Sequence, residues 1–476
     1  MNDSSMPWRS VSELSDQIHA GALSPIDLMA HLLSRVDSLN GKLNAFRPLD
    51  PDRSLAAARA AEIALQAGQD WGPLHGIPLA VKDIIDIKGL PTTAGARSLG
   101  NAIAESDATV ALKLRRAGMV ILGKTQTVKF AMGAPGINRD HGTPHNPWAE
   151  DHHVPGGSSS GSAVAVAAGL VPAALGTDTG GSVRIPAALC GTVGLKTTVG
   201  QVSRAGVFPI SSTLDSVGPL TRSVEDAALL YQAMNGPDVR DPSTRDADDH
   251  DVLFRLRNGV RGMRVAMAEG ALWDDVDPQV ASAVRAAGDV YAGRGAHVEF
   301  LELTEAKDVL AANPRLLISR VEGFLAHETL LGPEYDDYDD TLRFRLAEGA
   351  NAPAAAYLRA RSSCESLSAR ALDTLADVEA SLAPTTANPA LPVAEVDASS
   401  ESYQYWNGAY SRNTLVGNLL GLCAVTVPCG FNEQGLPIGL MVHAKPHCEA
   451  VALRVAYAYE QATDWHQRAP GLDWAI

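Results

Sequence analysis

Cysteine is scarce in this sequence, and its few copies show no paired spacing. The five are Cys190, Cys364, Cys423, Cys429 and Cys448, an odd number with no CxxC pair among them. Disulfide frameworks and thiolate metal sites both depend on regular, close cysteine spacing. We therefore expect free thiols in a cytoplasmic protein, with no metal ion and no other cofactor.

Long apolar runs and clustered basic residues are also missing. No stretch approaches the roughly 18 uninterrupted apolar residues of a membrane-spanning helix, and the N-terminal MNDSSMPWRS lacks the apolar core of a signal peptide. With 39 Lys and Arg against 55 Asp and Glu, the formal net charge is −16. Nucleic-acid surfaces need clustered Lys and Arg, so the sequence predicts a soluble protein that binds neither nucleic acid nor membrane.

The chain does contain enough apolar residues, 46% of 476, for an extensive core. Apolar residues at helical spacing predict helices over 11–40, 56–67, 107–117 and 277–293, with Ser24 as a cap before Pro25. Short apolar runs predict strands at 77–83, 120–123, 170–176, 263–270 and 297–303. This alternation indicates an α/β fold with a largely parallel sheet and helices on both faces.

Three later segments have distinct compositions. Residues 235–251 are rich in Asp, Pro and Arg, which predicts a loop and the main internal boundary. Residues 397–410 are polar and aromatic, and two interpretations stay open for them: a loop that faces the substrate, or aromatic rings packed beneath a loop. Glycine alternating with apolar residues over 413–428 predicts a central strand.

Glycine and serine concentrate in residues 155–196, which contain two Gly-Gly-Ser turns. One turn ends at Ser158 and the other at Ser182, and each precedes a predicted helix. Helix starts carry unpaired N–H groups and a partial positive charge, which suit a site that holds developing negative charge. The strand predicted between the turns could return the second serine to the side of the first. Upstream, Lys82 lies at the end of a buried strand.

These motifs, GIPLAVKD, PGGSSSGS and GTDTGGS, resemble those of the amidase signature family of serine hydrolases. The family includes fatty acid amide hydrolase and the glutaminase subunit of the tRNA-dependent amidotransferase. The resemblance extends from about residue 45 to YEQATDWHQRAP near the C-terminus. It implies a large twisted mixed sheet flanked by helices, in one domain over 1–476: a helical cap at about 8–65, the signature core at about 70–235, and a C-terminal sheet and substrate-pocket region at about 253–476.

The resemblance also assigns roles. It implies that Ser182 is the nucleophile and that Lys82 is the base. Ser158, which follows a cis peptide bond, is the bridging serine that passes the proton from Ser182 to Lys82. Lysine removes a proton only when it is uncharged, and burial at the end of a strand lowers its pKa toward neutrality. Backbone N–H groups are expected to form the oxyanion hole. The main chain of one residue and the hydroxyl of another are expected to contact the substrate. The expected oxyanion groups are those of Thr179, Gly180, Gly181 and Ser182, and the expected substrate contacts are Ala131 and Ser158.

The resemblance predicts hydrolysis of an amide C–N bond in a small molecule, with an aryl amide or a carbamate as credible a substrate as a simple amide, and self-association as a dimer. The alternative is a glutaminase subunit of the amidotransferase complex; Lys129, where that subunit has an acid, argues against it. A third hypothesis is a nucleophile elbow, because residues 157–161 also fit GxSxG. An elbow requires an apolar strand before the glycine, and EDHHVP is polar.

Overall fold

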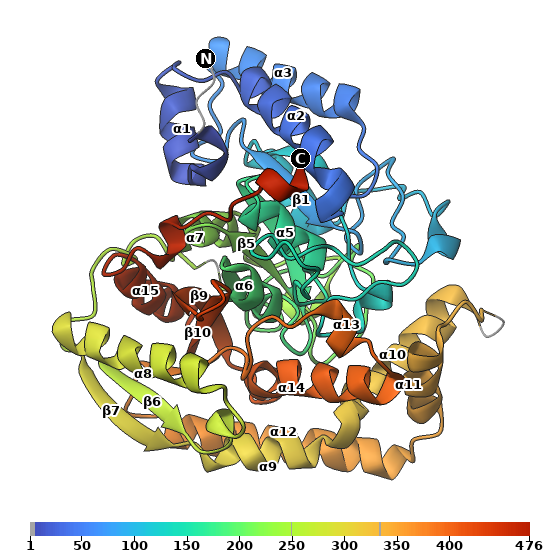
Figure 1. Ribbon diagram of the computed structural model, residues 1–476, viewed down its shortest axis with the longest axis vertical. Helices are drawn as coiled ribbons and strands as arrows, with labels where there is room; N and C mark the ends of the chain where they lie inside the picture. Colours follow the sequence, from blue (N-terminus) through green and yellow to red (C-terminus); the bar gives the residue numbers. More distant parts are fainter. Residues whose placement is uncertain (1–4, 249, 333–334) are drawn as a thin grey trace.

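A computed structural model describes residues 5–248, 250–332 and 335–476. Within these residues one ten-stranded sheet runs through the molecule in the order β2-β1-β3-β5-β4-β9-β10-β8-β6-β7. The strands are β1 Pro78–Lys82, β2 Val120–Thr125, β3 Ala173–Asp178, β4 Val193–Lys196, β5 Ser216–Thr221, β6 Arg264–Glu269, β7 His297–Glu302, β8 Ala380–Pro384, β9 Cys423–Phe431 and β10 Pro437–Ala444. Helices lie on both sides of the sheet (Figure 1).

The α-helices form groups around the sheet. At one end lie α1 to α3, at the other α9 and α12, with α10 and α11 projecting at one side of the view (Figure 1). They are α1 Val11–His19, α2 Pro25–Leu43, α3 Pro51–Gln66, α4 Thr109–Arg116, α5 Ser160–Ala167, α6 Arg184–Cys190, α7 Val224–Met234, α8 Pro278–Gly293, α9 Thr304–Ala312, α10 Leu317–Leu331, α11 Asp340–Ala350, α12 Ala354–Thr374, α13 Val393–Val396, α14 Ser400–Leu419 and α15 Glu449–Glu460.

Local chemistry explains several element boundaries. The Ser24 side chain accepts from the backbone amides of Ile26 and Asp27, with Pro25 in the first turn of α2, so the predicted cap is confirmed. Strands β1 to β5 are buried along their whole length, in keeping with their nearly continuous apolar sequence. These strands therefore belong to the core, together with the equally buried β8 and β10.

The expectation of a largely parallel sheet is wrong. Parallel pairing is confined to the two ends, where β1 joins β2 and β3, and β6 joins β7 and β8. Between them β3, β5, β4, β9, β10 and β8 pair antiparallel in succession. Antiparallel neighbours need no crossover helix. The alternation of helices and strands in the sequence therefore correctly predicted parallel pairing only at the two ends of the sheet. The mixed sheet that the resemblance implied is confirmed.

Both interpretations of 397–410 assumed a loop, and a strand was predicted from 413; the structure has a helix instead. Residues 400–419 form helix α14, whose N-cap Ser399 accepts from the amide of Ser402. The strand begins only at Cys423. From Tyr410 onward nearly the whole helix is buried, so it has no polar face to produce a helical pattern in the sequence.

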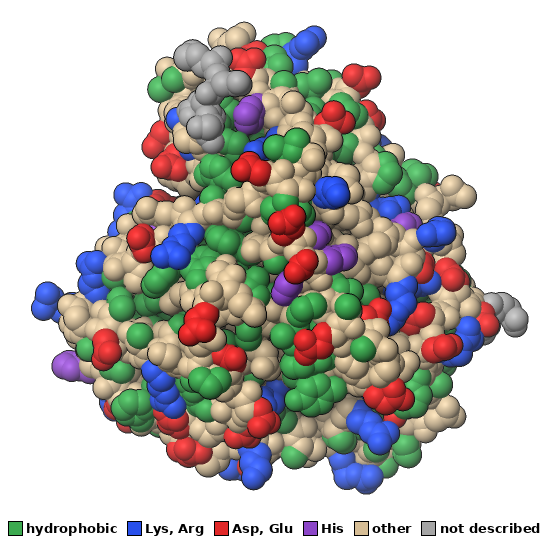
Figure 2. Space-filling model, viewed as in Figure 1, with side chains coloured by type: hydrophobic (Ala, Val, Ile, Leu, Met, Phe, Trp, Pro, Cys, Tyr) green, Lys and Arg blue, Asp and Glu red, His purple; other side chains and the backbone are tan. Residues whose placement is uncertain are grey.

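The outer surface carries charges of both signs. Figure 2 shows acidic and basic side chains scattered over one face with apolar ones between them, rather than basic residues gathered in a stripe. Among the helices of the described residues, none combines the length and the apolar character needed to cross a membrane.

Candidate active site

Lys82 ends strand β1 and is completely buried. Its Nζ donates to Ser158 Oγ and to Thr177 Oγ1, both at 2.8 Å. Burial lowers the Lys82 pKa to about 7, against the opposing pull of the Asp178 and Asp215 carboxylates. A lysine near this pKa is present at neutral pH in both its charged and uncharged forms, so it can accept and return a proton.

The two serine turns lie side by side beyond Lys82. The backbone amide of Ser159 donates to the carbonyl oxygen of Ser182 at 3.2 Å, which joins the segment before α5 to the segment before α6. The peptide bond between Gly157 and Ser158 is cis. Ser158 is fully buried, whereas Ser182 is partly exposed and lines a cavity. Among the described contacts no hydrogen bond joins the Ser158 and Ser182 hydroxyls.

A buried ion pair holds the loop before Ser182. Arg184 donates to Asp178 through Nε and Nη2, at 3.0 Å each, and both side chains are inaccessible to solvent. The Asp178 pKa is driven far below its usual range because the Arg184 charge and hydrogen bonds outweigh burial, which alone raises it. Asn418 Nδ2 of α14 donates to the same carboxylate at 2.9 Å. Because Asp178 also accepts from the amides of Gly181 and Val183, the pair fixes the conformation of this loop.

The amide of Gly181 is not available to a substrate. It donates to Asp178 Oδ1 at 2.8 Å, and Gly181 is absent from the described cavity lining, whereas Thr179, Gly180 and Ser182 belong to it. The expectation that all four amides face the oxyanion is therefore corrected at Gly181. Its φ of +125° and a Cβ position only 2.1 Å from Thr414 Oγ1 require glycine there.

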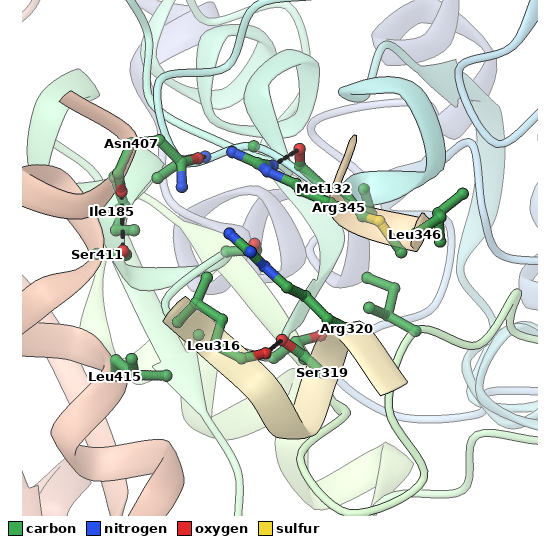
Figure 3. A pocket seen from close by; sticks show the side chains of 17 residues that line it. Met132, Ile185, Leu316, Ser319, Arg320, Arg345, Leu346, Asn407, Ser411 and Leu415 are labelled. Carbon is green, nitrogen blue, oxygen red and sulfur yellow. Dashed lines mark hydrogen bonds between the residues drawn. The ribbon is translucent and has the colours of Figure 1, made fainter. Parts of the chain in front are cut away.

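The cavity in front of Ser182 has a volume of about 90 Å³. Figure 3 shows its wall, made by residues 131–134 and by side chains from α6, α10, α11 and α14. The lining residues are Ala131, Met132, Gly133, Ala134, Thr179, Gly180, Ser182, Ile185, Ile210, Leu316, Ser319, Arg320, Arg345, Leu346, Asn407, Ser411 and Leu415. Of the two expected substrate contacts, Ala131 belongs to the lining and has a left-handed φ of 56°, whereas Ser158 is outside the described lining.

Helix α14 contributes polar rather than aromatic groups to this wall. Asn407, Ser411 and Leu415 recur every fourth residue and so share one helix face. Tyr403 and Tyr410 are instead buried in an apolar cluster with residues of α6. Of the two interpretations left open for this segment, the packing of aromatic rings is the one that the structure supports.

Two residues close to Lys82 and to the loop before Ser182 were not identified from the sequence. Thr177 is the second partner of Lys82, and Asp215 accepts from Thr179 Oγ1 at 2.5 Å and from the amides of Ile210 and Ser211. The signal for Thr177 was present, because it precedes Thr179 by two positions in GTDT and side chains alternate along a strand. Asp215 lies 33 residues from Ser182 in sequence and carries no local signal.

The nucleophile-elbow hypothesis does not fit the structure. Residues 146–156 include an isolated bridge at His153 but no strand, although an elbow requires one. An elbow serine also needs a histidine base, and His443, which lies downstream, is fully buried. Burial and the nearby Arg184 and Lys196 charges lower the His443 pKa to about 3.

Comparisons with known proteins agree with this geometry. The family model described as Amidase matches residues 27–453. A glutamyl-tRNA(Gln) amidotransferase subunit from Geobacter metallireducens is 36% identical over 97% of this chain and 99% of that protein. A solved structure described as a vestigial protein complex that reveals the origins of an s-triazine catabolic enzyme is 32% identical, with a TM-score of 0.87 over 95% of this chain and 98% of its own.

The peptide amidase of Stenotrophomonas maltophilia is also 32% identical, with a TM-score of 0.82 over 98% of this chain and all of its own. The matched family model covers most of the sequence, including Lys82 and both serine turns. The sequence resemblance, the mixed sheet and these matches agree that the chain belongs to the amidase signature family, whose members act on carbon–nitrogen bonds.

Proposed function

We propose that this enzyme hydrolyses a small carboxylic amide through an acyl-enzyme formed on Ser182. The observation that carries the proposal is the fully buried Lys82, 2.8 Å from Ser158, with a pKa lowered to about 7 by burial. Serine alone is a weak nucleophile and needs an adjacent base. An uncharged Lys82 supplies that base through Ser158, whose hydroxyl can accept one proton while it donates another.

In the proposed reaction, Ser182 Oγ attacks the amide carbonyl carbon. Its proton passes to Ser158, and the Ser158 proton passes to Lys82, so the lysine becomes charged as the oxyanion forms. When the tetrahedral intermediate collapses, the C–N bond breaks and the same relay returns a proton to the departing nitrogen. Water then attacks the acyl carbon and gives a proton to the relay. The bond between that carbon and Ser182 Oγ breaks, and the relay returns the proton to Ser182 as the acid leaves.

The oxyanion requires hydrogen-bond donors on the cavity side of the loop. We assign this role to the backbone amides of Thr179, Gly180 and Ser182, which line the cavity, and leave out that of Gly181. One such donor contributes roughly 3 kcal/mol to stabilisation of the transition state. The Asp178–Arg184 pair and the Thr414 hydroxyl, which donates to the Gly180 carbonyl at 2.8 Å, hold the loop in place.

The size of the cavity favours a short acyl chain. Its 90 Å³ are fewer than the roughly 150 Å³ of an engineered core cavity that holds one benzene molecule. Aliphatic side chains such as Ile185, Ile210 and Leu415 form part of its wall. Hydrolysis of an aryl amide or a carbamate stays a prediction. The cavity volume does not favour a substrate whose ring lies on the acyl side of the amide.

A second candidate is the glutaminase subunit of a tRNA-dependent amidotransferase. It is favoured by the name of the Geobacter metallireducens protein, with 36% identity over 97% of this chain. The lining argues against it, because no Asp or Glu is among the described lining residues. The α-ammonium group of glutamine would therefore enter the cavity without a carboxylate to pair with.

The test is release of ammonia or amine by the purified chain from propionamide, pentanamide, an anilide, a carbamate and L-glutamine, with Ser182→Ala as the matched control. We expect release from the short amides, abolished in the variant. Release from glutamine alone, and only with added partner subunits, would establish the second candidate. Equal rates for the wild type and the variant would contradict both.

A further inference from the structure

Two arginine side chains stand in the wall of the cavity that Ser182 faces. Arg320 comes from α10 and Arg345 from α11, far from the serine turns in sequence. Figure 3 shows the two guanidinium groups turned into the same cavity, with Arg345 beside Asn407 and Arg320 reaching up from its helix. Two cations in one small cavity repel each other, so this placement needs a source of negative charge.

Arg345 has no such source within the described residues. Only 8% of the residue is exposed, and none of the described carboxylates forms an ion pair with it. Its Nη1 donates to the carbonyl oxygen of Met132 at 2.7 Å, and its guanidinium lies 5.7 Å from the centre of the Tyr403 ring. A buried guanidinium has five N–H donors and a full charge, and a neutral carbonyl and a ring satisfy these only in part.

Arg320 is paired, but its surroundings remain positive. It contacts Glu348, which also pairs with Arg315 at 2.8 Å, so one carboxylate serves two arginines. Burial and the neighbouring charges of Arg345 and Arg315 lower the Arg320 pKa to about 10, so it stays charged at neutral pH. Arg320 and Arg345 against Glu348 leave a net charge of +1 on this side of the cavity, since Arg315 is mostly exposed and lies outside the described lining.

We propose that the cavity selects amides whose acyl chain ends in a carboxylate, with Arg320 and Arg345 as the groups that bind that carboxylate. The proposal rests on the function proposed above and narrows its substrate class to the monoamides of short dicarboxylic acids. A guanidinium binds a carboxylate through paired hydrogen bonds in one plane. The substrate carboxylate then supplies the missing counter-charge, and its position sets the amide carbon against Ser182.

The same wall excludes a positively charged acyl chain. With no acidic residue in the described lining and two arginines in it, an ammonium group would be desolvated and repelled. Glutaric acid monoamide and L-glutamine differ only by the α-amino group of glutamine. The monoamide is therefore the preferred member of this pair, and pentanamide, which lacks the carboxylate, is the neutral reference.

Kinetics with Arg320→Gln test the proposal. The wild type should hydrolyse glutaric monoamide with a kcat/KM roughly tenfold or more above that for pentanamide, the size expected for a charge-assisted contact. The variant should lose that advantage mainly through KM, so that its ratio of kcat/KM for glutaric monoamide to that for pentanamide falls to near one. Arg315→Gln is the matched control, because Arg315 pairs with the same Glu348 but is 76% exposed and outside the described lining. It should change neither rate.

Binding to Ser182→Ala separates this proposal from the proposed function. The variant cannot turn over, so calorimetry reports affinity even if no amide is hydrolysed. Tighter binding of glutaric monoamide than of pentanamide or 5-aminopentanamide, lost on adding Arg320→Gln, supports the arginine site. Equal affinity for the three amides overturns it. Hydrolysis of neutral amides alone, abolished by Ser182→Ala, would retain the proposed function and overturn only the anionic substrate class.

Discussion

Lys82 and Ser158 are fully buried, and with Ser182 they lie on a strand end or on turns that lead into α5 and α6. The opposite wall of the cavity has another origin. Arg320 and Ser411 belong to α10 and α14, which follow Ser182 by more than a hundred residues. The first group is surrounded by sheet and loop backbone that leaves little freedom. The second consists of side chains on helices, which can be exchanged without altering the sheet. The groups proposed to break the bond and those proposed to select the substrate therefore come from separate parts of the fold.

Among the proposed catalytic residues Lys82, Ser158 and Ser182, which we call the relay side, replacement of Ser182 by alanine should cause the largest loss of activity. Removal of the nucleophile in a serine hydrolase lowers kcat by roughly 10³-fold to 10⁶-fold. Amine release in a single-turnover assay measures it, and unchanged circular dichroism shows that the fold is retained. A variant that still releases a burst of amine would move the nucleophile elsewhere.

Lys82→Met should lower kcat by roughly 10²-fold to 10⁴-fold, the usual contribution of a positioned base. In the wild type, activity should fall as the pH drops below about 7, because Lys82 becomes charged there. The variant should lose that dependence, and a pH–rate profile measures it.

The pH dependence of stability provides a check on Lys82 that does not require activity. Because the folded pKa lies below the unfolded value of about 10.4, the unfolded state binds more protons between these pH values. The free energy of unfolding contributed by Lys82 therefore rises with pH from about 7 to about 10. Denaturation curves of Lys82→Met should lack this rise, and an identical rise in both proteins would contradict the lowered pKa.

Thr177→Val should have a smaller effect on the same side. It removes one of the two hydroxyl partners of Lys82 at nearly constant volume, and a lost hydrogen bond of this kind corresponds to about tenfold in kcat. The control is Thr221→Val, whose hydroxyl donates to the carbonyl of Ser223 at the end of β5 far from Thr177. If both variants reduce kcat equally, Thr177 acts only through stability.

The smallest effect is expected from Leu415→Ala on the opposite wall of the cavity, which we call the wall side. This variant should alter substrate preference rather than the rate of bond breaking. It enlarges the cavity and should shift kcat/KM about threefold to tenfold toward an acyl chain longer by one or two methylenes. Leu419→Ala is the control, because Leu419 is equally buried one turn further along α14 and is not part of the described lining. A kcat change without a change in chain-length preference would argue against separate roles.

The relay side could be located from the sequence because its residues stand in short, contiguous motifs. Glycines, serines and a lysine at fixed positions mark turns and a strand end, and the structure brings Lys82 within 2.8 Å of Ser158. The orientation of single amides could not be obtained this way. The direction of the Gly181 N–H depends on the side chain of Asp178, which is held by Arg184 and by Asn418 from a distant helix.

The wall side carried no usable signal. Arg320 and Arg345 lie on helices, where arginine is ordinarily a solvated residue, and only the packing of α10 against α11 turns both toward one cavity. Helix α14 was mistaken for a loop and a strand because burial on most of its sides removes the period that identifies a helix. The antiparallel centre of the sheet was missed because it depends on pairing between strands far apart in sequence.

That pairing has a consequence during synthesis. One edge of strand β4 pairs with β5, and the other pairs with β9, which begins only at Cys423. Strand β10 then pairs with both β9 and β8. Since a growing polypeptide leaves the ribosome from its N-terminal end, the β4 edge stays unpaired until nearly the whole chain has emerged. A shortened translation product would retain the nucleophilic hydroxyl yet expose an open edge prone to aggregation, so hydrolytic activity is expected only from the complete polypeptide.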